Sequence, residues 1–549
     1  LAATAHGAVV EGRVADDGGI PLPGVTVTLV VPGKPLTTVT DSDGRFMFGG
    51  VKHGTYTIRA TLAGFNSTGS SVRVNAERVG PLLLTLRVAA VSETITVTAD
   101  APIDIAPRRR IREHAFVDTK KQHRTTFAID VDRASYASIR ADLHAGRLPD
   151  ADMVRIEEMV NYFTYSYPQP EGAAPFSVTT EVAGCPWNPK HRLLRVGIQG
   201  RNLEQWKMAP NNLVFLIDVS GSMADTLPVL QDAFRVLVRE LRAEDRVAIV
   251  VYAGAAGLVL PSTSGADKQT ILAAIDALEA GGSTAGGEGI ELAYAVAQEN
   301  FLEDGNNRVI LATDGDFNVG PSSAEELERL IETKRRGGVF LSVVGVGGDD
   351  ERMETLADKG NGNYAMIDSP REAEKVFRTE LTGTLVTIAK DVKVQLEFDR
   401  ALIRSYRQIG YENRALENED FENDEKDAGE LGAGHSVTAL FELVPVADDA
   451  RGRIGALRLR WKEPRGFRSK GPLVTEVIDE GKGAYEASPD MQFAAAVAEL
   501  GMLLRDSPHK GTASWDDVVR LAALSRDADL DGTRKEFVEL VAIAKGLDE

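Results

Sequence analysis

The sequence predicts a multidomain protein: an N-terminal β-sandwich, then a Rossmann-like α/β domain inserted in a second β-sandwich, and a helical C-terminal segment. Residues 7–97 consist of short alternating runs separated by Gly, Pro and Asp turns, which indicates a small sandwich. Residues 211–385 alternate between nearly continuous apolar strands and amphipathic helices, which is typical of a parallel sheet covered on both faces. Strand-like runs at 176–200 and 391–480 stand on either side of that region, and we expect them to pair.

The length, net charge and cysteine content of the chain exclude several classes of protein. A chain of 549 residues is too long for one hydrophobic core. Its net charge of −20 argues against nucleic-acid binding, which needs clustered Lys and Arg. No apolar run approaches the roughly 20 residues that span a bilayer. The single cysteine, Cys185, excludes an intrachain disulfide, and the first residues, LAATAHG, resemble the tail of a cleaved signal peptide.

Composition and periodicity divide the chain into parts. They are the N-terminal sandwich at 1–99, a linker at 100–125, helices and strands at 126–205, the α/β domain at 211–385, strands at 386–480 and helices at 486–549. The linker combines prolines with the basic cluster Arg108–Arg110 and shows no clean period. Apolar residues at three-to-four spacing predict helices at 134–148, 153–165, 489–504 and 514–547.

The N-terminal strands carry the motifs GRV (12–14), PLPGVTV (21–27) and TDSDGRFMF (40–48). This pattern resembles the carboxypeptidase regulatory-like domain. The resemblance implies an extracytoplasmic location and a binding or spacer role, and it does not imply peptidase activity.

The strongest chemical signal lies where the first strand of the α/β domain ends. The sequence IDVSGSM places Asp218, Ser220 and Ser222 on one tight turn at the carboxyl end of a parallel strand, the edge at which ligands bind in open α/β sheets. Asp314, in ATDGD, ends another apolar strand that we expect at the same edge. Thr284, in GGSTAGG, lies in a loop between two helices.

Together these five residues make an all-oxygen set of two carboxylates and three hydroxyls, which suits a hard cation. Mg²⁺ fits best, with Mn²⁺ and Ca²⁺ as alternatives. Without a cation, Asp218 and Asp314 would face each other as like charges partly removed from water, which raises a carboxyl pKa or costs stability.

The same residues resemble the metal-ion-dependent adhesion site of von Willebrand factor A domains. Asp218, Ser220 and Ser222 match the first-loop D-x-S-x-S pattern, Thr284 matches the family's threonine and Asp314 its third-loop aspartate. The resemblance implies that the serines and the threonine coordinate the metal directly, and that the aspartates act directly or through water. It also implies that a protein ligand supplies an Asp or Glu carboxylate at the last position.

The resemblance extends beyond this domain. TTFAIDVDRASYASIR, VRIEEMVNYFTY and CPWNP before it, and IAKDVKVQLEF, IGYENR and DAGELGAGHSVTALFE after it, are similar to bacterial A-domain proteins with matched flanking extensions. Roughly residues 125–549 are covered.

Other acidic stretches have structural alternatives that we favour. DADLDGTRKEF (527–537) has the spacing of an EF-hand loop, but Val538 stands where the bidentate ligand belongs, which favours a capped helix. DAGELGAGH (427–435) could form a second metal site, although a Gly-rich connection is the better interpretation. Asp130 and Asp132, at an apparent strand end, are interpreted as structural.

The leading hypothesis is therefore metal-dependent capture of a partner protein at the cell surface, in the periplasm or in the medium, by a protein that is not an enzyme. No HExxH, GxSxG, GxxxxGK[ST] or paired CxxC motif is present. A structural or assembly component of the cell envelope is one alternative. A metal-dependent hydrolase is another, with only Asp316 and Glu288 near the site in sequence as bases. The oligomeric state stays open.

Overall fold

The structure is a computed structural model that divides into two compact units, Leu1–Pro102 and Ile103–Glu549, and each is considered by itself. It describes residues 8–16, 21–22, 24–31, 36–41, 43–61, 65–66, 68–88, 111–203, 208–253, 256–281, 286–314, 324–346, 351–380, 386–412, 415–426, 428–464, 466, 468–529 and 531–548. Within these ranges, no helix has the length and apolar character needed to cross a membrane.

The N-terminal unit is a sandwich of two four-stranded sheets, ordered β4-β1-β8-β6 and β3-β2-β5-β7. Its strands are β1 (Ala8–Asp16), β2 (Thr26–Val30), β3 (Leu36–Val39), β4 (Arg45–Val51), β5 (Gly54–Thr61), β6 (Phe65–Asn66), β7 (Thr68–Val74) and β8 (Arg78–Val88). Alternate residues such as Val27, Leu29 and Phe46 point into one core between the sheets. The predicted sandwich is confirmed, while the strand expected at 93–99 lies outside the described residues.

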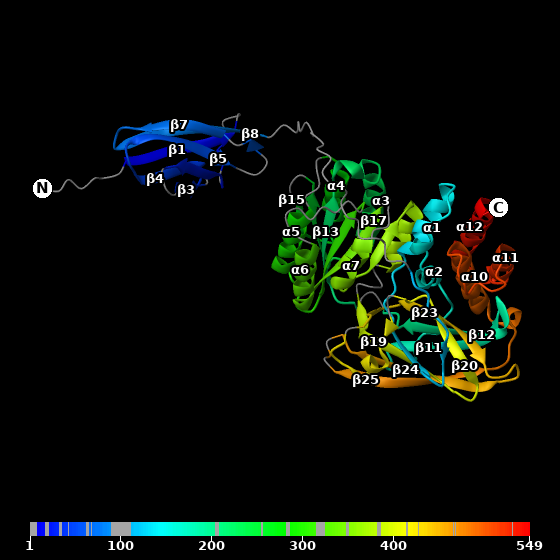
Figure 1. Ribbon diagram of the computed structural model, residues 1–549. Coiled ribbons are helices and arrows are strands. Elements are labelled where there is room, and N and C mark those ends of the chain that lie inside the picture. The colour runs from blue at the N-terminus through cyan, green and yellow to red at the C-terminus, as the bar shows by residue number, and fades with distance from the viewer. Residues whose placement is uncertain are drawn as a thin grey trace. The chain divides into compact units, whose positions relative to one another are not determined.

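The α/β domain is built on one six-stranded sheet, ordered β15-β14-β13-β16-β17-β18 (Figure 1). The strands are β13 (Asn211–Asp218), β14 (Arg246–Tyr252), β15 (Ala256–Ser264), β16 (Asn306–Thr313), β17 (Val339–Val346) and β18 (Tyr364–Ile367). All neighbours are parallel except β15, which pairs antiparallel with β14. The sequence did not predict β15, because a bulge beside Ile249 and the exposed Leu258 and Val259 break its alternation.

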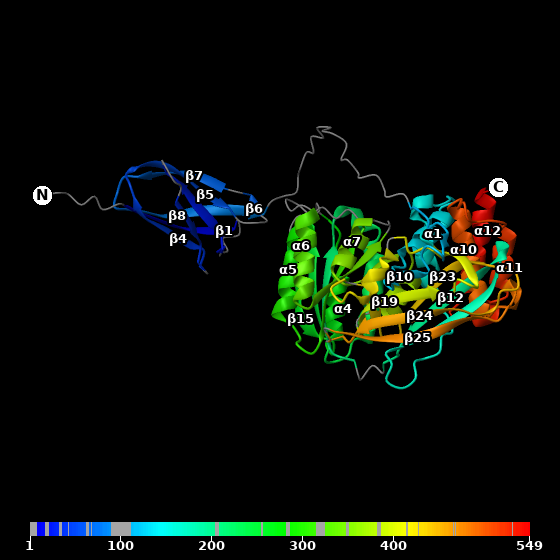
Figure 2. The same ribbon diagram turned by 60° about the horizontal axis from the view of Figure 1, so that its bottom comes forward.

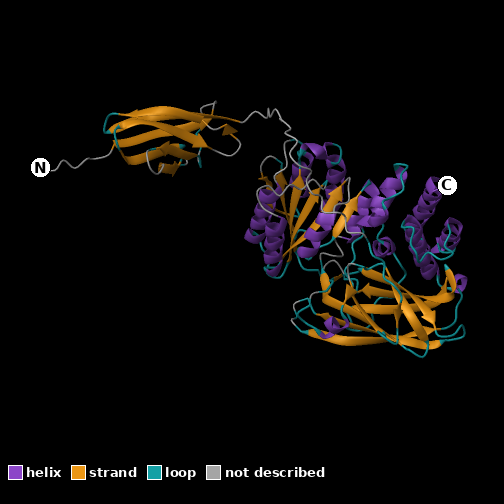
Figure 3. Ribbon diagram, viewed as in Figure 1, coloured by secondary structure: helices purple, strands orange, loops and turns teal. Residues whose placement is uncertain are grey.

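Helices cover both faces of this sheet, as Figure 3 shows. They are α3 (Leu227–Glu240), α4 (Lys268–Asp276), α5 (Gly286–Glu299), α6 (Ala324–Arg336), α7 (Glu351–Lys359) and α8 (Pro370–Glu374). One core joins the sheet to α3, α4 and α8, and a second joins its other face to α5, α6 and α7. The predicted parallel core with helices on both faces is thus confirmed, with one antiparallel edge strand added.

The α/β domain is inserted in a second sandwich. One sheet is ordered β11-β12-β23-β20-β9 and the other β21-β10-β19-β24-β25, with β22 paired to β19. The strands before the insertion are β9 (Val117–Asp118), β10 (Arg124–Ala128), β11 (Phe176–Cys185) and β12 (Asn188–Gly200). Those after it are β19 (Thr387–Phe398), β20 (Ile403–Ile409), β21 (Ala415–Leu416), β22 (Leu431–Gly432), β23 (Ser436–Pro445), β24 (Gly452–Lys462) and β25 (Ser469–Asp479). We call this the flanking sandwich.

The expected pairing of strands across the insertion is present, since β12 pairs with β23 and β10 with β19. One local expectation was wrong, because β9 lies in the stretch interpreted as a linker. β10 begins in that stretch too and ends at Ala128, just before Asp130, which agrees with the strand end expected there. Both strands are short. β9 pairs with β20 and β10 pairs with β19, and this pairing between distant segments cannot be seen in the local sequence pattern.

A helical layer completes this unit. It comprises α1 (Ala134–His144), α2 (Ile156–Tyr162), α10 (Pro489–Leu504), α11 (Trp515–Ala523) and α12 (Thr533–Asp548). Figure 2 shows α1, α10, α11 and α12 grouped together, and they share one apolar core with α2. The C-terminal segment predicted to be helical contains α11 and α12, and the 3₁₀ turn Arg526–Ala528 lies between them.

Candidate metal centre

Three strands end side by side at the carboxyl edge of the α/β sheet. Asp218 is the last residue of β13, Tyr252 of β14 and Thr313 of β16. The parallel register pairs Asp218 with Tyr252, and Ile217 with Ala312 on the other side. The buried apolar strands therefore deliver three polar side chains to one place, which is the edge where open α/β sheets bind ligands.

The Asp218 carboxylate is fully buried and held at both oxygens. The backbone N–H of Ser220 donates to Oδ1 at 2.8 Å, and the Thr313 hydroxyl donates to Oδ2 at 3.2 Å. These contacts come from the first loop and from a neighbouring strand. The orientation of the carboxylate is therefore set by the fold itself.

Ser220 and Ser222 present a pair of hydroxyl oxygens beside this carboxylate. Ser220 is buried and Ser222, in the short 3₁₀ turn Gly221–Ala224, is exposed. Their Oγ atoms lie 3.0 Å apart and share a hydrogen bond. Two neighbouring ligands of an octahedral Mg²⁺, each at about 2.1 Å from the ion, also lie about 3.0 Å apart. The pair already has the spacing of two adjacent ligands.

The surroundings of Asp218 disfavour the charged form of its carboxyl group. Burial raises the pKa of Asp218 above its usual range, and the negative charge of Asp314 raises it further. Hydrogen bonds from Ser220 and Tyr252 act in the opposite direction but do not cancel the rise. Burial also raises the pKa of Tyr252 well above its usual value, and the charge of Asp218 raises it further, so the hydroxyl keeps its proton.

Asp314 follows Thr313 directly and is half-buried beside the same edge. Its charge raises the pKa of Asp218, so the two carboxylates lie near each other at this edge. Thr284 lies outside the described residues. The stretch that contains it starts after Gly281, whose N–H donates to the carbonyl of Val219 at 2.7 Å, and ends at the first residue of α5.

The donors at this edge fit a hard cation. Carboxylates, hydroxyls and backbone groups all offer oxygen, which Mg²⁺, Mn²⁺ and Ca²⁺ prefer. No group of three or more His, Cys, Asp or Glu side chains suited to a metal occurs within the part of the chain that the structure describes. The described donors at this edge that could hold a cation are the carboxylates of Asp218 and Asp314 and the hydroxyls of Ser220 and Ser222.

The EF-hand-like stretch, residues 527–537, contains the residues that cap α12. Asp531 Oδ1 accepts hydrogen bonds from the N–H and the hydroxyl of Thr533, at 3.0 and 2.6 Å. The two carboxylate oxygens of Asp529 accept from the N–H groups of Arg534 and Lys535, at 3.2 and 3.0 Å. This geometry agrees with the capped-helix interpretation.

The remaining candidates have structural roles or lie outside the described residues. Cys185 is buried in the core, and burial raises its thiol pKa well above the usual value. Asp132 accepts a hydrogen bond from the N–H of Tyr364 at 3.0 Å, which ties the flanking segment to β18. Asp427 and Arg108–Arg110 lie outside the described residues.

Sequence reasoning missed two participants, Tyr252 and Thr313. Each ends an apolar strand, in VAIVVY and RVILAT, and that position was the available signal. Neither matches a ligand motif, and their role depends on the register between strands. Both lie against Asp218.

Four family models match the chain. The model described as von Willebrand factor type A domain matches residues 212–379, and one described as von Willebrand factor matches 107–195. The carboxypeptidase regulatory-like domain matches residues 9–87. The model described as "Uncharacterized protein YfbK, C-terminal" matches residues 383–547.

Individual proteins are also similar. The "Uncharacterized protein YfbK" of Escherichia coli is 42% identical over 454 residues, covering 77% of this chain and 78% of that protein. The "Uncharacterized protein sll0103" of Synechocystis is 26% identical over 197 residues, which are 36% of this chain and 46% of that protein. The solved structure "von Willebrand factor type A from Catenulispora acidiphila" is 19% identical, with a TM-score of 0.36, covering 66% of this chain and 90% of that one.

Proposed function

Because the chain belongs to the YfbK family of proteins with a von Willebrand factor type A domain, we propose that it is an extracytoplasmic protein that captures a partner carboxylate through a divalent cation. Domains of this type mediate protein interactions. The cation is Mg²⁺ by preference, with Mn²⁺ and Ca²⁺ as alternatives. Its ligands are Asp218, Ser220, Ser222, Thr284 and Asp314.

One observation carries the proposal: a buried carboxylate beside two hydroxyls at ligand spacing. Asp218 is fully buried at a strand end, and the Oγ atoms of Ser220 and Ser222 stand 3.0 Å apart next to it. A buried anion with a second carboxylate nearby is unfavourable unless a positive charge compensates it. A bound cation supplies that compensation and a coordination position for an incoming carboxylate.

Each residue has a distinct part in this proposal. Asp218 contributes the buried negative charge, held in place by the Ser220 N–H and the Thr313 hydroxyl. Ser220 and Ser222 contribute neutral oxygens, which leave the cation's charge largely uncompensated and so favour an anionic guest. Ser222 is exposed, so the guest approaches from its side.

The partner and the location follow from the same reasoning. The guest is the Asp or Glu side chain of a partner protein, because a carboxylate is the oxygen anion that proteins present most often. An extracytoplasmic location is supported by the pairing of this domain with a carboxypeptidase regulatory-like domain. It is also supported by the single cysteine, which is compatible with many exported bacterial proteins.

Isothermal titration of the full chain with MgCl₂ and MnCl₂ tests the first half of the proposal. We expect one cation per chain for the natural protein and at least tenfold weaker binding for Asp218→Ala and for the double variant Ser220→Ala, Ser222→Ala. Asp276→Asn is the matched control, because Asp276 is an exposed carboxylate that pairs with Arg235 on the helices.

Capture from the native envelope fraction tests the second half. We expect a partner that is retained in Mg²⁺, released by EDTA and not captured by Asp218→Ala. Equal capture by the natural protein and by Asp218→Ala contradicts the mechanism. An assembly whose size is indifferent to EDTA favours the structural alternative.

A further inference from the structure

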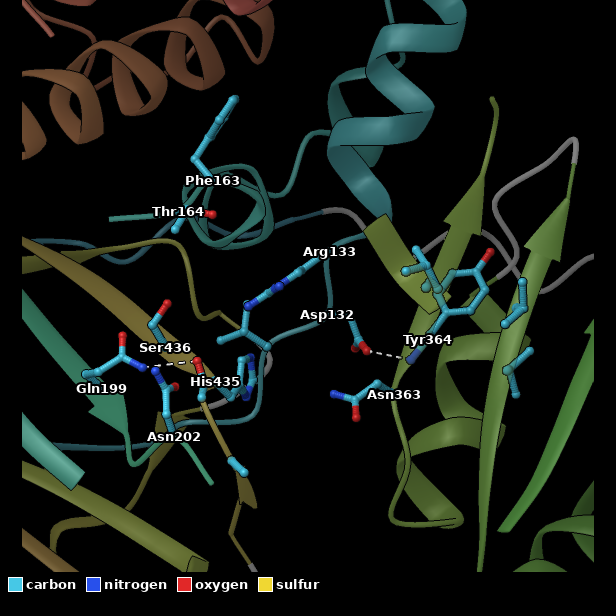
Figure 4. A pocket seen from close by; sticks show the side chains of 17 residues that line it. Asp132, Arg133, Phe163, Thr164, Gln199, Asn202, Asn363, Tyr364, His435 and Ser436 are labelled. Carbon is cyan, nitrogen blue, oxygen red and sulfur yellow. Dashed lines mark hydrogen bonds between the residues drawn. The ribbon is translucent and has the colours of Figure 1, made fainter. Parts of the chain in front are cut away.

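The junction between the α/β domain and the flanking sandwich contains a cavity of about 270 Å³ beside Arg133 and one of about 710 Å³ at the amino-terminal edge of the α/β sheet. In the smaller cavity, Figure 4 shows Asp132 bonded to the backbone of Tyr364, and Gln199 donates to the carbonyl of Gly434 at 3.0 Å. These groups are already engaged within the protein. The larger cavity has polar groups that are available to a ligand.

The larger cavity lies at the opposite end of the sheet from the metal centre. On the side of the α/β domain it is bounded by the starts of β16 and β17 and by the end of α6. On the other side it is bounded by the start of β19, the end of β24 and the turn after β24. Pockets for small molecules have volumes of about 300–1,000 Å³, and a volume of about 710 Å³ lies within that range.

Two lysines stand opposite each other in the wall from the flanking sandwich. Lys390 of β19 and Lys462 of β24 are cross-strand neighbours, and like charges in that position destabilise a sheet. Lys462 is compensated, because its Nζ lies 2.8 Å from Asp391 Oδ2 and donates to the carbonyl of Asp424 at 2.6 Å. No hydrogen bond or ion pair reaches the half-buried Lys390 ammonium from the part of the chain that the structure describes. The positive charge of Lys390 is therefore available at the cavity.

Arg336 brings a second positive charge from the wall of the α/β domain. It is the last residue of α6 and lines the rim of the cavity, with its side chain 74% exposed. Its ion pair with Glu332 is 3.7 Å long, whereas Lys359 lies 2.9 Å from the same carboxylate. A long and exposed ion pair contributes little free energy, so the Arg336 guanidinium can turn to a ligand at small cost.

The acidic side chains of this cavity have cations beside them. Two of them form ion pairs, Asp391 with Lys393 at 3.3 Å and Asp424 with Arg460 at 3.1 Å. Glu430 lies near the buried Arg308: burial lowers the pKa of that guanidinium to about 10, and the charge of Glu430 acts in the opposite direction. The fourth acid, Asp304, is exposed and is matched in number by Arg335, which also lines the cavity. The two available cations therefore favour an anionic ligand.

Neutral groups in the same cavity can bind hydroxyls. The Asn361 carboxamide and the Thr387 hydroxyl both line it, and neither has a hydrogen-bond partner within the described ranges. An amide and a hydroxyl can each donate and accept, which suits the hydroxyl groups of a ligand. Phe340, Val386 and Pro464 add apolar surface. A ligand that fits these walls has an anionic end and a body that carries hydroxyls and an apolar face.

We propose that this cavity binds a sugar that carries a phosphate monoester. The phosphate has a charge of about −1.5 to −2 at pH 7 and meets Lys390 and Arg336, the two available cations. Arginine offers a fork of donors that matches phosphate oxygens, and lysine adds a compact point charge. The sugar hydroxyls bond to Asn361 and Thr387, and the apolar face of the ring packs on Phe340. Because the ligand contacts both domains, it stabilises the junction between them.

Titration calorimetry and thermal melting of the full chain in EDTA test the assignment, because EDTA removes any cation that could hold a phosphate at the metal edge. The probes are glucose 6-phosphate, mannose 6-phosphate and N-acetylglucosamine 6-phosphate, and glucose and inorganic phosphate each lack one half of them. We expect one molecule of at least one sugar phosphate per chain, a raised melting temperature and at least tenfold weaker binding of glucose and of inorganic phosphate. No heat and no shift with any of the three probes at millimolar concentration overturns the proposal, as does inorganic phosphate binding as tightly as the best probe.

Two variants test the location. Lys390→Gln and Arg336→Gln each remove one positive group and should weaken binding of the best probe at least tenfold. The controls are Lys535→Gln and Arg147→Gln, which remove exposed positive charges away from the cavity and should leave binding unchanged. Circular dichroism verifies folding. Unchanged binding in either folded cavity variant contradicts the location.

Lys390→Gln has a second readout. It removes one of two facing lysines, so the melting temperature of the protein without ligand should stay the same or rise. A lower melting temperature contradicts the finding that the Lys390 charge is available to a ligand.

Asp218→Ala separates this inference from the proposed function. The cavity and the metal centre share no residue among those described, so Asp218→Ala should bind the sugar phosphate as the natural protein does. Binding that needs Mg²⁺ and is lost in a folded Asp218→Ala variant assigns the phosphate to the metal centre and overturns this inference, while the proposed function stands.

Discussion

Thr313 Oγ1 donates a hydrogen bond to Asp218 Oδ2 at 3.2 Å, across 95 residues of sequence. The bond joins the ends of two parallel strands and is buried. With the Ser220 N–H on the other oxygen, it holds the carboxylate in one orientation before any ligand arrives. Pre-oriented ligands lose less freedom on binding, so the contacts behind the carboxylate should affect cation affinity.

The Tyr252 hydroxyl also lies next to Asp218, and removing it should weaken cation binding. It interacts with Asp218 and Thr313 from the end of β14. We expect Tyr252→Phe to lower Mn²⁺ affinity about tenfold, the lower end of the effect of groups that orient metal ligands. Titration calorimetry or the paramagnetic resonance of bound Mn²⁺ measures it.

Tyr294→Phe is the matched control for that variant. Tyr294, in α5, is also fully buried, and burial likewise raises its hydroxyl pKa, but Asp218 is not among the causes of that rise. It should leave Mn²⁺ affinity unchanged while altering stability by a similar amount. Equal effects of the two variants on affinity would assign the Tyr252 effect to general loosening of the domain.

Without cation, stability should depend on pH through Asp218. Burial is the chief cause that raises the pKa of Asp218 in the folded protein above the unfolded value of about 3.9. The stabilisation from its protonated form is therefore fully present below the unfolded pKa and is lost as the pH rises through the folded pKa. Asp218→Asn should remove this loss of stability, which amounts to about 1.4 kcal/mol for each unit by which the folded pKa exceeds the unfolded pKa. Urea unfolding in EDTA at several pH values measures it, and added Mg²⁺ should stabilise only the natural protein.

Glu499 should cause a second decrease in the free energy of unfolding as the pH rises. It is fully buried in α10, neither of its oxygens has a hydrogen-bond partner among the described residues, and burial raises its pKa to about 8. Stability from the protonated form should decline from the unfolded pKa of about 4.3 up to about pH 8. Glu499→Met, of similar volume and apolar, should abolish the decline and stabilise the protein by a few kcal/mol at pH 8. A natural protein as stable at pH 8 as at pH 5 contradicts this.

Removing the buried charge of Arg140 should lower the free energy of unfolding far more than removing an exposed charge. Its guanidinium, 4% exposed, donates to both oxygens of Asp368 at 2.6 and 2.7 Å and to Glu372 at 2.7 Å, joining α1 to the end of the α/β domain. Arg140→Met leaves buried carboxylates without their cation and should cost about 3–5 kcal/mol. Arg235→Met, which breaks more exposed ion pairs, should cost less than about 1 kcal/mol. Urea unfolding compares them.

The layered architecture could be predicted because long periodic segments dominate it. Positions 213–217 of β13 are all apolar and fully buried, which is the pattern of a strand in a sheet covered on both faces. β15 escaped prediction, because it is a bulged edge strand with Leu258 and Val259 exposed. The cap of α12 was predictable from DADLDGTRKEF, and the structure has Asp529 and Asp531 accepting hydrogen bonds from the first residues of that helix.

The site was predictable in part. Asp218 and Asp314 could be placed at one edge because both end parallel strands, and the structure has them interacting. Tyr252 and Thr313 could not, since their contact with Asp218 depends on the register between strands. The cavity next to Lys390 was beyond prediction, because its walls come from segments far apart in the sequence.

The most direct test is an anomalous difference map from crystals of the full chain soaked in MnCl₂. We expect one strong peak at the carboxyl edge of the α/β sheet, within about 2.0–2.3 Å of Ser220 Oγ and Ser222 Oγ and close to Asp218, Thr284 and Asp314. A map without a peak at that edge, or with its peak elsewhere on the protein, contradicts a cation site built on Asp218.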